Sequence, residues 1–161
     1  QRNVHAADIE QPDAYLCTAY PVEDEEYYIY KFEALANAAT AHHMLLYGCD
    51  GEPLSTESIW DCPGMCKNGW STIMFAWAKN APPTVLHKGV ALRVGKNTSI
   101  KNHCTPDSEP TDHSGLKIYT TFQKPQFVAG IFLLASYWFQ IPPQVSCQQE
   151  MMSCSLTDDS F

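Results

Sequence analysis

The sequence predicts an all-β protein folded as an antiparallel β-sandwich, and three observations carry this prediction. Short apolar or alternating runs, rich in β-branched and aromatic residues, recur along the 161 residues. Clusters that contain Gly, Pro or Asn separate one run from the next. No stretch has the apolar stripe of an amphipathic helix, although residues 33–40 could form one helical turn. Short strands at such intervals are typical of a sandwich.

Three strands are predicted in the first half of the chain. Residues 27–32 are rich in aromatic residues and alternate in part. Residues 43–47 form a short apolar run that Gly48 closes. Residues 71–77 form another, which the Ala-Pro-Pro sequence at 81–83 stops, because proline cannot continue a ladder of hydrogen bonds.

Three further strands are predicted in the second half. Residues 90–94 alternate and end at Gly95, and residues 116–122 alternate most regularly. Residues 127–139 are the longest apolar run and are expected to form one or two buried strands, closed by Ile-Pro-Pro at 141–143. This run is shorter than the ~20 residues that a membrane-spanning helix needs, so no transmembrane segment is expected.

Composition places the chain among globular proteins of one domain. Apolar residues make up 45% and charged residues 17% of the chain, which favours a packed core over disorder. The formal net charge is −8. Because phosphate binding needs clustered Lys and Arg, this charge argues against a nucleic-acid partner.

Seven cysteines in a domain of this size favour the secretory pathway, and therefore a secreted protein or one in the lumen of secretory vesicles. The sequon Asn97-Thr98-Ser99 agrees, because it can carry a glycan only in that compartment. We therefore expect glycosylation at Asn97.

Disulfides are the favoured use of the cysteines. Cys62 and Cys66, together with His42 and His43, could suggest a zinc site, but zinc fingers separate their histidines by three to five residues and these are adjacent. Spacing leaves the connectivity of the disulfides open. The four candidates are Cys17, Cys49, Cys62 and Cys66. An odd number of others is left, namely Cys104, Cys147 and Cys154.

The clearest candidate for a metal site is the pair of adjacent histidines, His42 and His43, in an apolar stretch. Neutral imidazoles suit copper or zinc. Neighbouring side chains on a regular strand point to opposite faces, so the strand must bend, bulge or end there for both rings to reach one ion. The alternative is one buried and one exposed histidine, each hydrogen-bonded separately.

Several long motifs, in a preserved order, resemble the peptidylglycine α-hydroxylating monooxygenases. Residues 42–49, HHMLLYGC, are similar to the copper-binding stretch of that family. Residues 75–84, FAWAKNAPPT, and 88–95, KGVALRVG, are similar to its WARNAPPT and KGVGFRVG segments. DHSG at 112–115 and the region 129–143 match further parts. The LLYGC ending favours the peptide-amidating branch over dopamine β-monooxygenase.

The resemblance implies a domain plan. Residues 1–12 would be an N-terminal extension, residues 13–150 the N-terminal copper domain, and residues 151–161 a divergent tail. The family core consists of two β-sandwich domains, so a jelly-roll-like sandwich stapled by disulfides is expected here.

The resemblance also implies a chemistry. The N-terminal domain of the family holds one copper ion through the histidine pair and a third, later histidine, and this copper takes electrons from ascorbate. A second domain supplies a His-x-His pair and a Met for another copper, where oxygen and a glycine-extended peptide react. Because those ligands are absent here, the peptide is expected as a partner only if a second copper domain is supplied, and no catalytic residue is assigned to this chain.

The third ligand is assigned to His103, with His113 as the substitute. In the family this ligand lies in an apolar strand, whereas here residues 94–101 run directly into residues 102–106 with most of that strand absent. One strand of the family fold is therefore expected to be missing, which should weaken the core and expose an edge.

The resemblance pairs the cysteines as Cys17–Cys62 and Cys49–Cys66. Cys147 matches a cysteine that bridges to the second domain, so it is expected to be reactive or to pair with Cys154. In the tail, Met151, Met152 and Cys154 could hold Cu(I) as soft ligands, but a mobile tail is favoured.

Three functions stay open at this point. The chain is a truncated or divergent peptidylglycine monooxygenase, active only with a second domain. Alternatively it is a secreted copper-binding pseudoenzyme or a dopamine β-monooxygenase-like protein. The third reading is a structural or misassembled product without an intact metal site.

Overall fold

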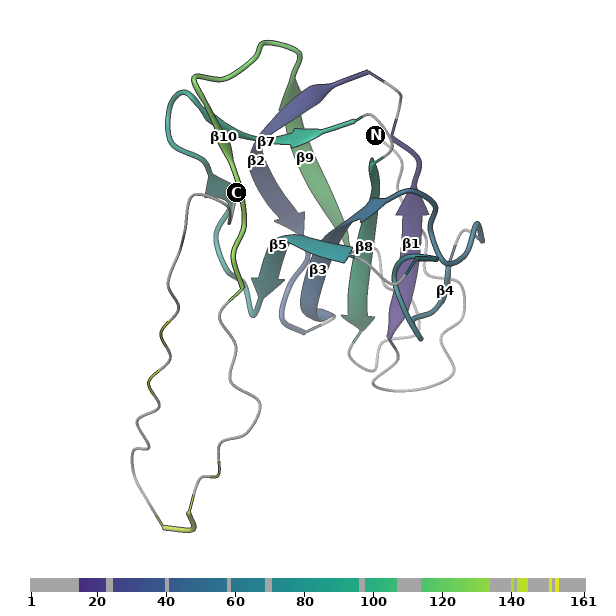
Figure 1. Ribbon diagram of the computed structural model, residues 1–161. Helices are drawn as coiled ribbons and strands as arrows, with labels where there is room; N and C mark the ends of the chain where they lie inside the picture. The colour runs from purple at the N-terminus through teal and green to yellow at the C-terminus, as the bar shows by residue number, and fades with distance from the viewer. Residues whose placement is uncertain are drawn as a thin grey trace. The chain divides into compact units, whose positions relative to one another are not determined.

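The computed structural model describes residues 15–22, 25–39, 41–57, 59–68, 71–95, 98–106, 114–133, 140, 142–144, 151 and 153. Residues 98–106 are described by their backbone alone. Contacts divide the chain into two units, residues 1–129 and residues 130–161. The strands of the described residues all lie in the first unit (Figure 1).

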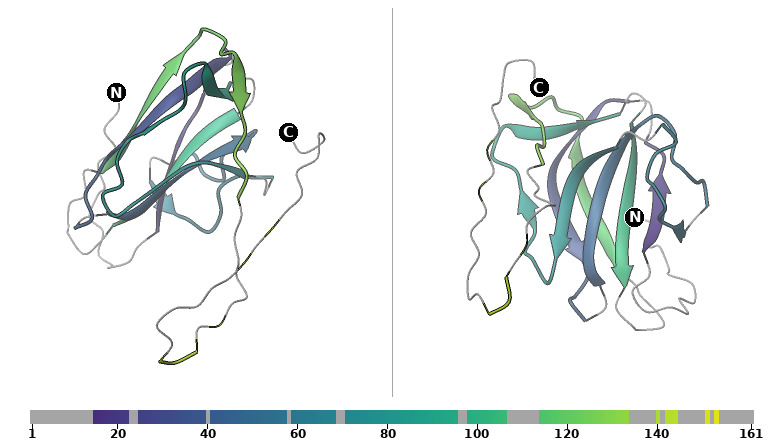
Figure 2. Two further views of the ribbon diagram at one scale, coloured as in Figure 1. Left: turned by 90° about the vertical axis from the view of Figure 1, so that its left-hand side faces the viewer. Right: turned by 60° about the horizontal axis from the view of Figure 1, so that its bottom comes forward.

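The first sheet has five strands in the order β4-β1-β8-β3-β5, and every neighbouring pair is antiparallel. In the right-hand view of Figure 2, β5, β3, β8 and β1 lie side by side, coloured teal, blue, green and purple. The strands are β1 (Leu16–Tyr20), β3 (Ala41–Asp50), β4 (Trp60–Asp61), β5 (Ser71–Ala78) and β8 (Thr98–Pro106).

The second sheet is built around β2 (Tyr27–Leu35). β9 (Gly115–Thr121) pairs with almost the whole length of β2, while β7 (Val90–Val94) and β6 (Thr84–Val85) pair with successive parts of it. β10 (Phe127–Ala129) runs parallel to β7. The prediction of an antiparallel sandwich is therefore confirmed, with this one parallel pair as the exception.

The core lies between the two sheets. Phe32 of β2 stacks on Phe75 of β5, with ring centroids 4.7 Å apart and planes 12° apart. Burying each such large side chain contributes about 1.5–3 kcal/mol relative to leaving it exposed. The buried cluster draws on both sheets and contains Ile29, Phe32, Ala41, Met44, Leu46, Met74, Phe75, Trp77, Leu92 and Val94.

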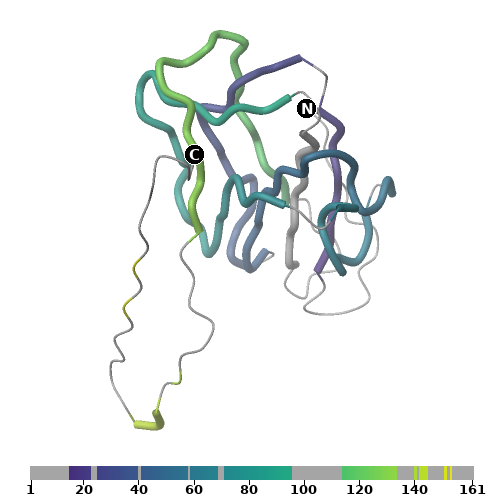
Figure 3. Tube along the Cα trace, in the orientation of Figure 1, coloured from purple at the N-terminus to yellow at the C-terminus, as the bar shows by residue number. Residues whose placement is uncertain are grey.

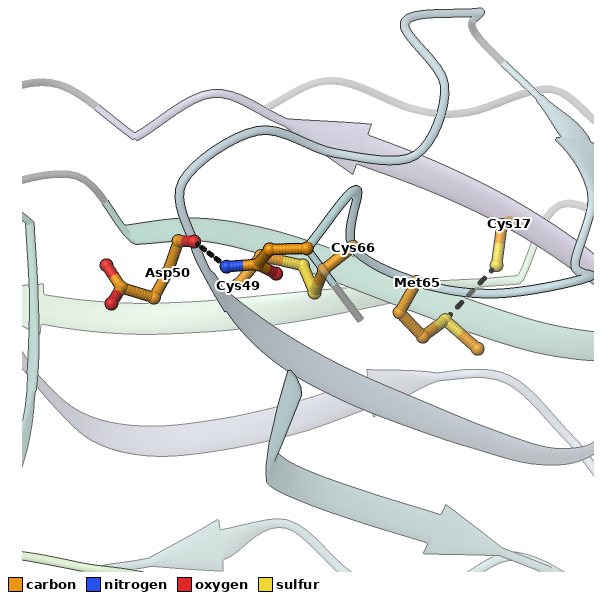
Figure 4. Close-up of a disulfide and its surroundings, with 6 residues drawn as sticks. Cys17, Cys49, Asp50, Met65 and Cys66 are labelled. Atoms are coloured by element: carbon orange, nitrogen blue, oxygen red, sulfur yellow. Dashed lines mark hydrogen bonds between the residues drawn. A yellow bond between two sulfur atoms is a disulfide. The ribbon is translucent and has the colours of Figure 1, made fainter. Parts of the chain in front are cut away.

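Two disulfides tie the segment between β3 and β5 to the first sheet. The pairs are Cys17–Cys62, with Cα atoms 5.4 Å apart, and Cys49–Cys66, with Cα atoms 5.7 Å apart. Figure 4 shows the second bridge, and beside it Met65, whose Sδ lies 3.6 Å from the Sγ of Cys17. Both pairings implied by the resemblance are confirmed.

Five of the predicted strands are confirmed, and most extend beyond the apolar run that predicted them. They are the runs at 27–32, 43–47, 71–77, 90–94 and 116–122. The helical turn considered for residues 33–40 is absent from the described part of that stretch. There, residues 33–35 continue β2 and residues 38–39 form a turn.

The prediction of buried strands over residues 127–139 is wrong where the structure describes them. Only Phe127–Ala129 forms a strand, and Phe132 and Leu133 are 53% and 59% exposed. An apolar run becomes a buried strand only where a neighbouring strand hydrogen-bonds to it and another layer packs on its face. β10 pairs with β7 for three residues only. Residues 134–139 lie outside the described residues.

The expectation of a missing strand before His103 is also corrected. Residues 98–106 form β8, which lies between β1 and β3 and pairs with both. Its sequence is too polar to signal a strand, but backbone hydrogen bonds on both sides hold it in place. No edge is therefore opened at this position. Within the described ranges, the structure contains no helix long and apolar enough to cross a membrane.

Candidate metal centre

His42 and His43 lie near the start of β3, where the strand carries a β-bulge. Against β8, Ala41 is opposite Pro106 and His43 is opposite Thr105, so two steps along β3 match one step along β8. His42 is the extra residue of the bulge. This bulge is one of the irregularities that would let both rings reach one ion.

The two imidazole rings lie next to each other in an edge-to-face arrangement. Their Nδ1 atoms are 3.1 Å apart, and their ring centroids are 5.3 Å apart with planes at 70°. His42 is exposed and His43 is partly buried. These exposures partly match the alternative of one buried and one exposed histidine, but the two rings also contact each other, which that alternative does not include.

Electrostatics favour the neutral form of His43. Burial lowers the pKa of its imidazole, and the nearby charge of His42 lowers this pKa further. A neutral imidazole keeps a lone pair on one ring nitrogen, which is the state that binds a metal. The more buried member of the pair is thus prepared for coordination at neutral pH.

The donor set fits a copper ion. Two nitrogens 3.1 Å apart can both lie about 2.0–2.1 Å from a shared ion, the usual length of a bond between imidazole and Zn²⁺. Imidazole suits copper as well as zinc. The mixed zinc site considered from the sequence is excluded, because Cys62 and Cys66 are both in disulfides.

The third ligand stays a prediction. The backbone of His103 lies opposite Leu45, two positions along β3 from His43, and on its other side opposite Cys17. Its side chain lies outside what the structure describes, as does the whole of His113. Among the described side chains, no third His, Cys, Asp or Glu joins the pair.

Other residues singled out from the sequence also fall outside the description. Neither Asn97 nor Met152 is described, and Met151 is described as 89% exposed. The side chain of Cys104 and the whole of Cys147 and Cys154 are undescribed. Glycosylation, the tail ligands and the pairing of these three cysteines stay predictions.

One neighbour of the pair was missed from the sequence. Tyr15 packs its ring against His43, with centroids 6.4 Å apart and planes at 62°. The backbone carbonyl of Tyr15 accepts a hydrogen bond of 3.1 Å from the N–H of Cys62. Tyr15 lies 28 positions from His43 in the sequence, so no local pattern could reveal this contact.

Comparison with known proteins shows which family this chain is similar to. Residues 2–104 match the family model described as copper type II ascorbate-dependent monooxygenase, N-terminal domain. The chain is 40% identical over 156 residues to peptidyl-glycine alpha-amidating monooxygenase A of Xenopus laevis, covering 89% of this chain and 16% of that protein. It is 38% identical over 160 residues to peptidylglycine alpha-amidating monooxygenase of Rattus norvegicus, covering 88% of this chain and 16% of that protein.

Proposed function

Because the chain belongs to the copper type II ascorbate-dependent monooxygenases, whose N-terminal domain it carries, we propose that His42 and His43 hold one copper ion that accepts electrons from ascorbate. The observation that carries this proposal is the bulge in β3, which places the two Nδ1 atoms 3.1 Å apart. We propose His103 as the third ligand.

The residues of the pair have different parts in this function. Partly buried His43 offers a neutral nitrogen because its pKa is lowered, which favours binding over protonation. Exposed His42 leaves one side of the site open to a small reductant. A copper ion held there would supply a one-electron couple between Cu(I) and Cu(II), and imidazole ligands tolerate both states.

The wider role comes from the relatives. They are named as amidating monooxygenases of peptidyl-glycine, and this chain spans 16–18% of the length of the first two. We propose that the domain serves the hydroxylation of glycine-extended peptides together with a second copper domain. The identity to amidating enzymes supports this role over that of a dopamine β-monooxygenase-like protein.

We also propose a secreted or secretory-vesicle location, with a glycan at Asn97. Two disulfides support an oxidising compartment, because such bonds are rare in the cytosol.

The electron-accepting role can be tested on the protein alone. The chain is loaded with one equivalent of Cu(II), freed of unbound metal and treated with ascorbate under argon. Electron paramagnetic resonance should show loss of the Cu(II) signal and its return on oxidation, with copper bound throughout. Retention of the Cu(II) signal under excess ascorbate, or release of copper on reduction, would contradict the proposal.

The third ligand has a separate test. Mutating a residue that only orients a metal ligand typically lowers metal affinity by about tenfold or more. Removing a ligand itself should have a larger effect, so His103→Ala should raise the copper dissociation constant by more than about tenfold. The matched variant is His113→Ala, which should leave affinity unchanged. The opposite result for the two variants would move the third ligand to His113.

A further inference from the structure

A tight turn follows β5, next to the histidine pair in the sheet. The N–H of Ala81 donates to the carbonyl oxygen of Ala78 at 3.0 Å, closing a four-residue turn. Its two central residues, Lys79 and Asn80, have φ angles of 47° and 63°. Left-handed backbone is uncommon outside glycine and is tolerated best by Asn, so this turn demands particular residues.

The turn is anchored to the core at one end. The indole Nε1–H of Trp77 donates to the carbonyl oxygen of Ala81 at 2.9 Å, and Trp77 is 3% exposed within the buried cluster. Residues 77–81 are the Trp-Ala-Lys-Asn-Ala part of a motif that the copper site by itself does not use. The turn is therefore a fixed point beside β3.

Asn80 contacts the connection between β2 and β3, whose course Figure 3 shows. The side-chain Oδ1 of Asn80 accepts a hydrogen bond of 2.8 Å from the backbone N–H of Ala38, 42 residues away in sequence. Asn37 supports the same connection from within. Its Oδ1 accepts from the N–H of Ala39 at 2.9 Å, and its carbonyl oxygen accepts from the N–H of Ala41 at 2.9 Å.

These contacts lie on both sides of the bulge. Ala41 immediately precedes His42, and Ala78, the first residue of the turn, is the partner of His43 across β3 and β5. The bonded positions thus bracket the extra residue that brings the two imidazoles together. A bulge locally disrupts its ladder and leaves the extra residue unpaired, so contacts outside the ladder contribute more to the direction of its side chains.

We propose that Asn80 is a positioning residue for the copper ligands: its hydrogen bond to the N–H of Ala38 fixes the bulge that brings the Nδ1 atoms of His42 and His43 together. The proposal rests on the proposed function for its copper readout. Its structural part concerns the arrangement of the two rings before any metal binds, which can be measured separately.

Asn80→Gly isolates the hydrogen bond. Glycine accepts a φ of 63° without strain, so the interaction lost from the fold is the Oδ1 acceptor. Glycine also makes the unfolded chain more flexible, and a thermal melt measures this cost and checks that the variant stays folded. Asn80→Asp keeps an acceptor at the same place and serves as the rescue. Asn68→Gly is the matched control, because the Nδ2 of Asn68 makes a comparable bond of 2.8 Å to the carbonyl oxygen of Asp50, at the other end of β3.

The first readout is the set of ring ¹H–¹⁵N resonances of His42 and His43 in metal-free protein, and the second is Cu(II) affinity with its paramagnetic resonance spectrum. In Asn80→Gly the ring resonances should move toward those of free imidazoles, and the copper dissociation constant should rise about three- to tenfold. Asn80→Asp should restore both readouts, and Asn68→Gly should leave both unchanged.

Unchanged ring resonances in folded Asn80→Gly would overturn the proposal. An equal change in Asn68→Gly would also overturn it, because the effect would then be one of general stability. If the native protein binds no copper while the ring resonances still respond to Asn80→Gly, the proposed function fails and the positioning role stands.

Discussion

At the scale of residues, the candidate site depends on a shift of one residue in the pairing of β3 with β8. Because His42 is the extra residue of this bulge, the side chains of two adjacent histidines can reach the same ion, whereas on a regular strand they would point to opposite faces. Their environments differ, since His42 is exposed and His43 is partly buried against Tyr15. Burial of His43, and then the nearby charge of His42, lower the pKa of His43. The stability of the metal-free protein therefore depends on pH.

The sign of this pH dependence follows from the lowered pKa. In the unfolded chain His43 takes up a proton near the ordinary pKa of about 6.5, whereas in the fold it stays neutral to a lower pH. Acid therefore favours unfolding. The contribution of His43 to the free energy of unfolding is fully present above about pH 6.5 and should be lost as the pH falls from there through the lower pKa of the folded state. Denaturant unfolding of the metal-free protein at a series of pH values across this range measures that free energy. The decline should be shallower in His43→Gln, and an equal decline in both proteins would contradict the assignment.

At the same scale, the sequence predicted the histidine pair, and a bend, bulge or end of the strand if both rings were to reach one ion, but not the residues that contact the pair and its turn. A His-His pair in an apolar run is visible locally. By contrast, Tyr15 and Asn80 act through contacts with partners 28 and 42 positions away, as the ring packing and the bond to Ala38 show. Only the packing of separate strands creates such contacts.

At the scale of elements, apolar runs predicted strands well where they met the core and failed elsewhere. The runs containing Phe32 and Phe75 became the centre of the sandwich. The polar strand β8 was missed, because pairing with β1 and β3 rather than its own pattern makes it a strand. The length of the strand that begins at residue 127 was overestimated for the opposite reason, since the run is apolar but pairs with β7 for three residues only.

The two disulfides should contribute unequally to stability. Cys17–Cys62 joins residues 45 positions apart and Cys49–Cys66 joins residues 17 apart, and longer loops lose more entropy in the unfolded chain. The loop-entropy model gives about 4 and about 3 kcal/mol respectively. Replacing both cysteines of each bridge by Ala should therefore lower the free energy of unfolding more for the Cys17–Cys62 pair. A clearly larger loss for the Cys49–Cys66 pair would show that strain or residual structure outweighs loop entropy.

At the scale of the whole molecule, the domain is a sandwich with the candidate metal-ligand pair near the start of a central strand. Strand β3 pairs on both sides, with β8 and β5, so the pair stands on a well-supported element rather than a free loop. The chain spans 16% of the length of two of its relatives. The proposed function depends on one claim, that His42 and His43 together hold copper.

Copper stoichiometry tests that claim most directly. After equilibrium dialysis against buffered Cu(II), the native protein should carry one copper per chain, and His42→Ala and His43→Ala should each retain much less. His87→Ala is the matched control, because His87 is exposed and lies in the turn before β7, so it should match the native protein. Full copper content in His42→Ala and His43→Ala, or a loss confined to His87→Ala, would contradict the central claim.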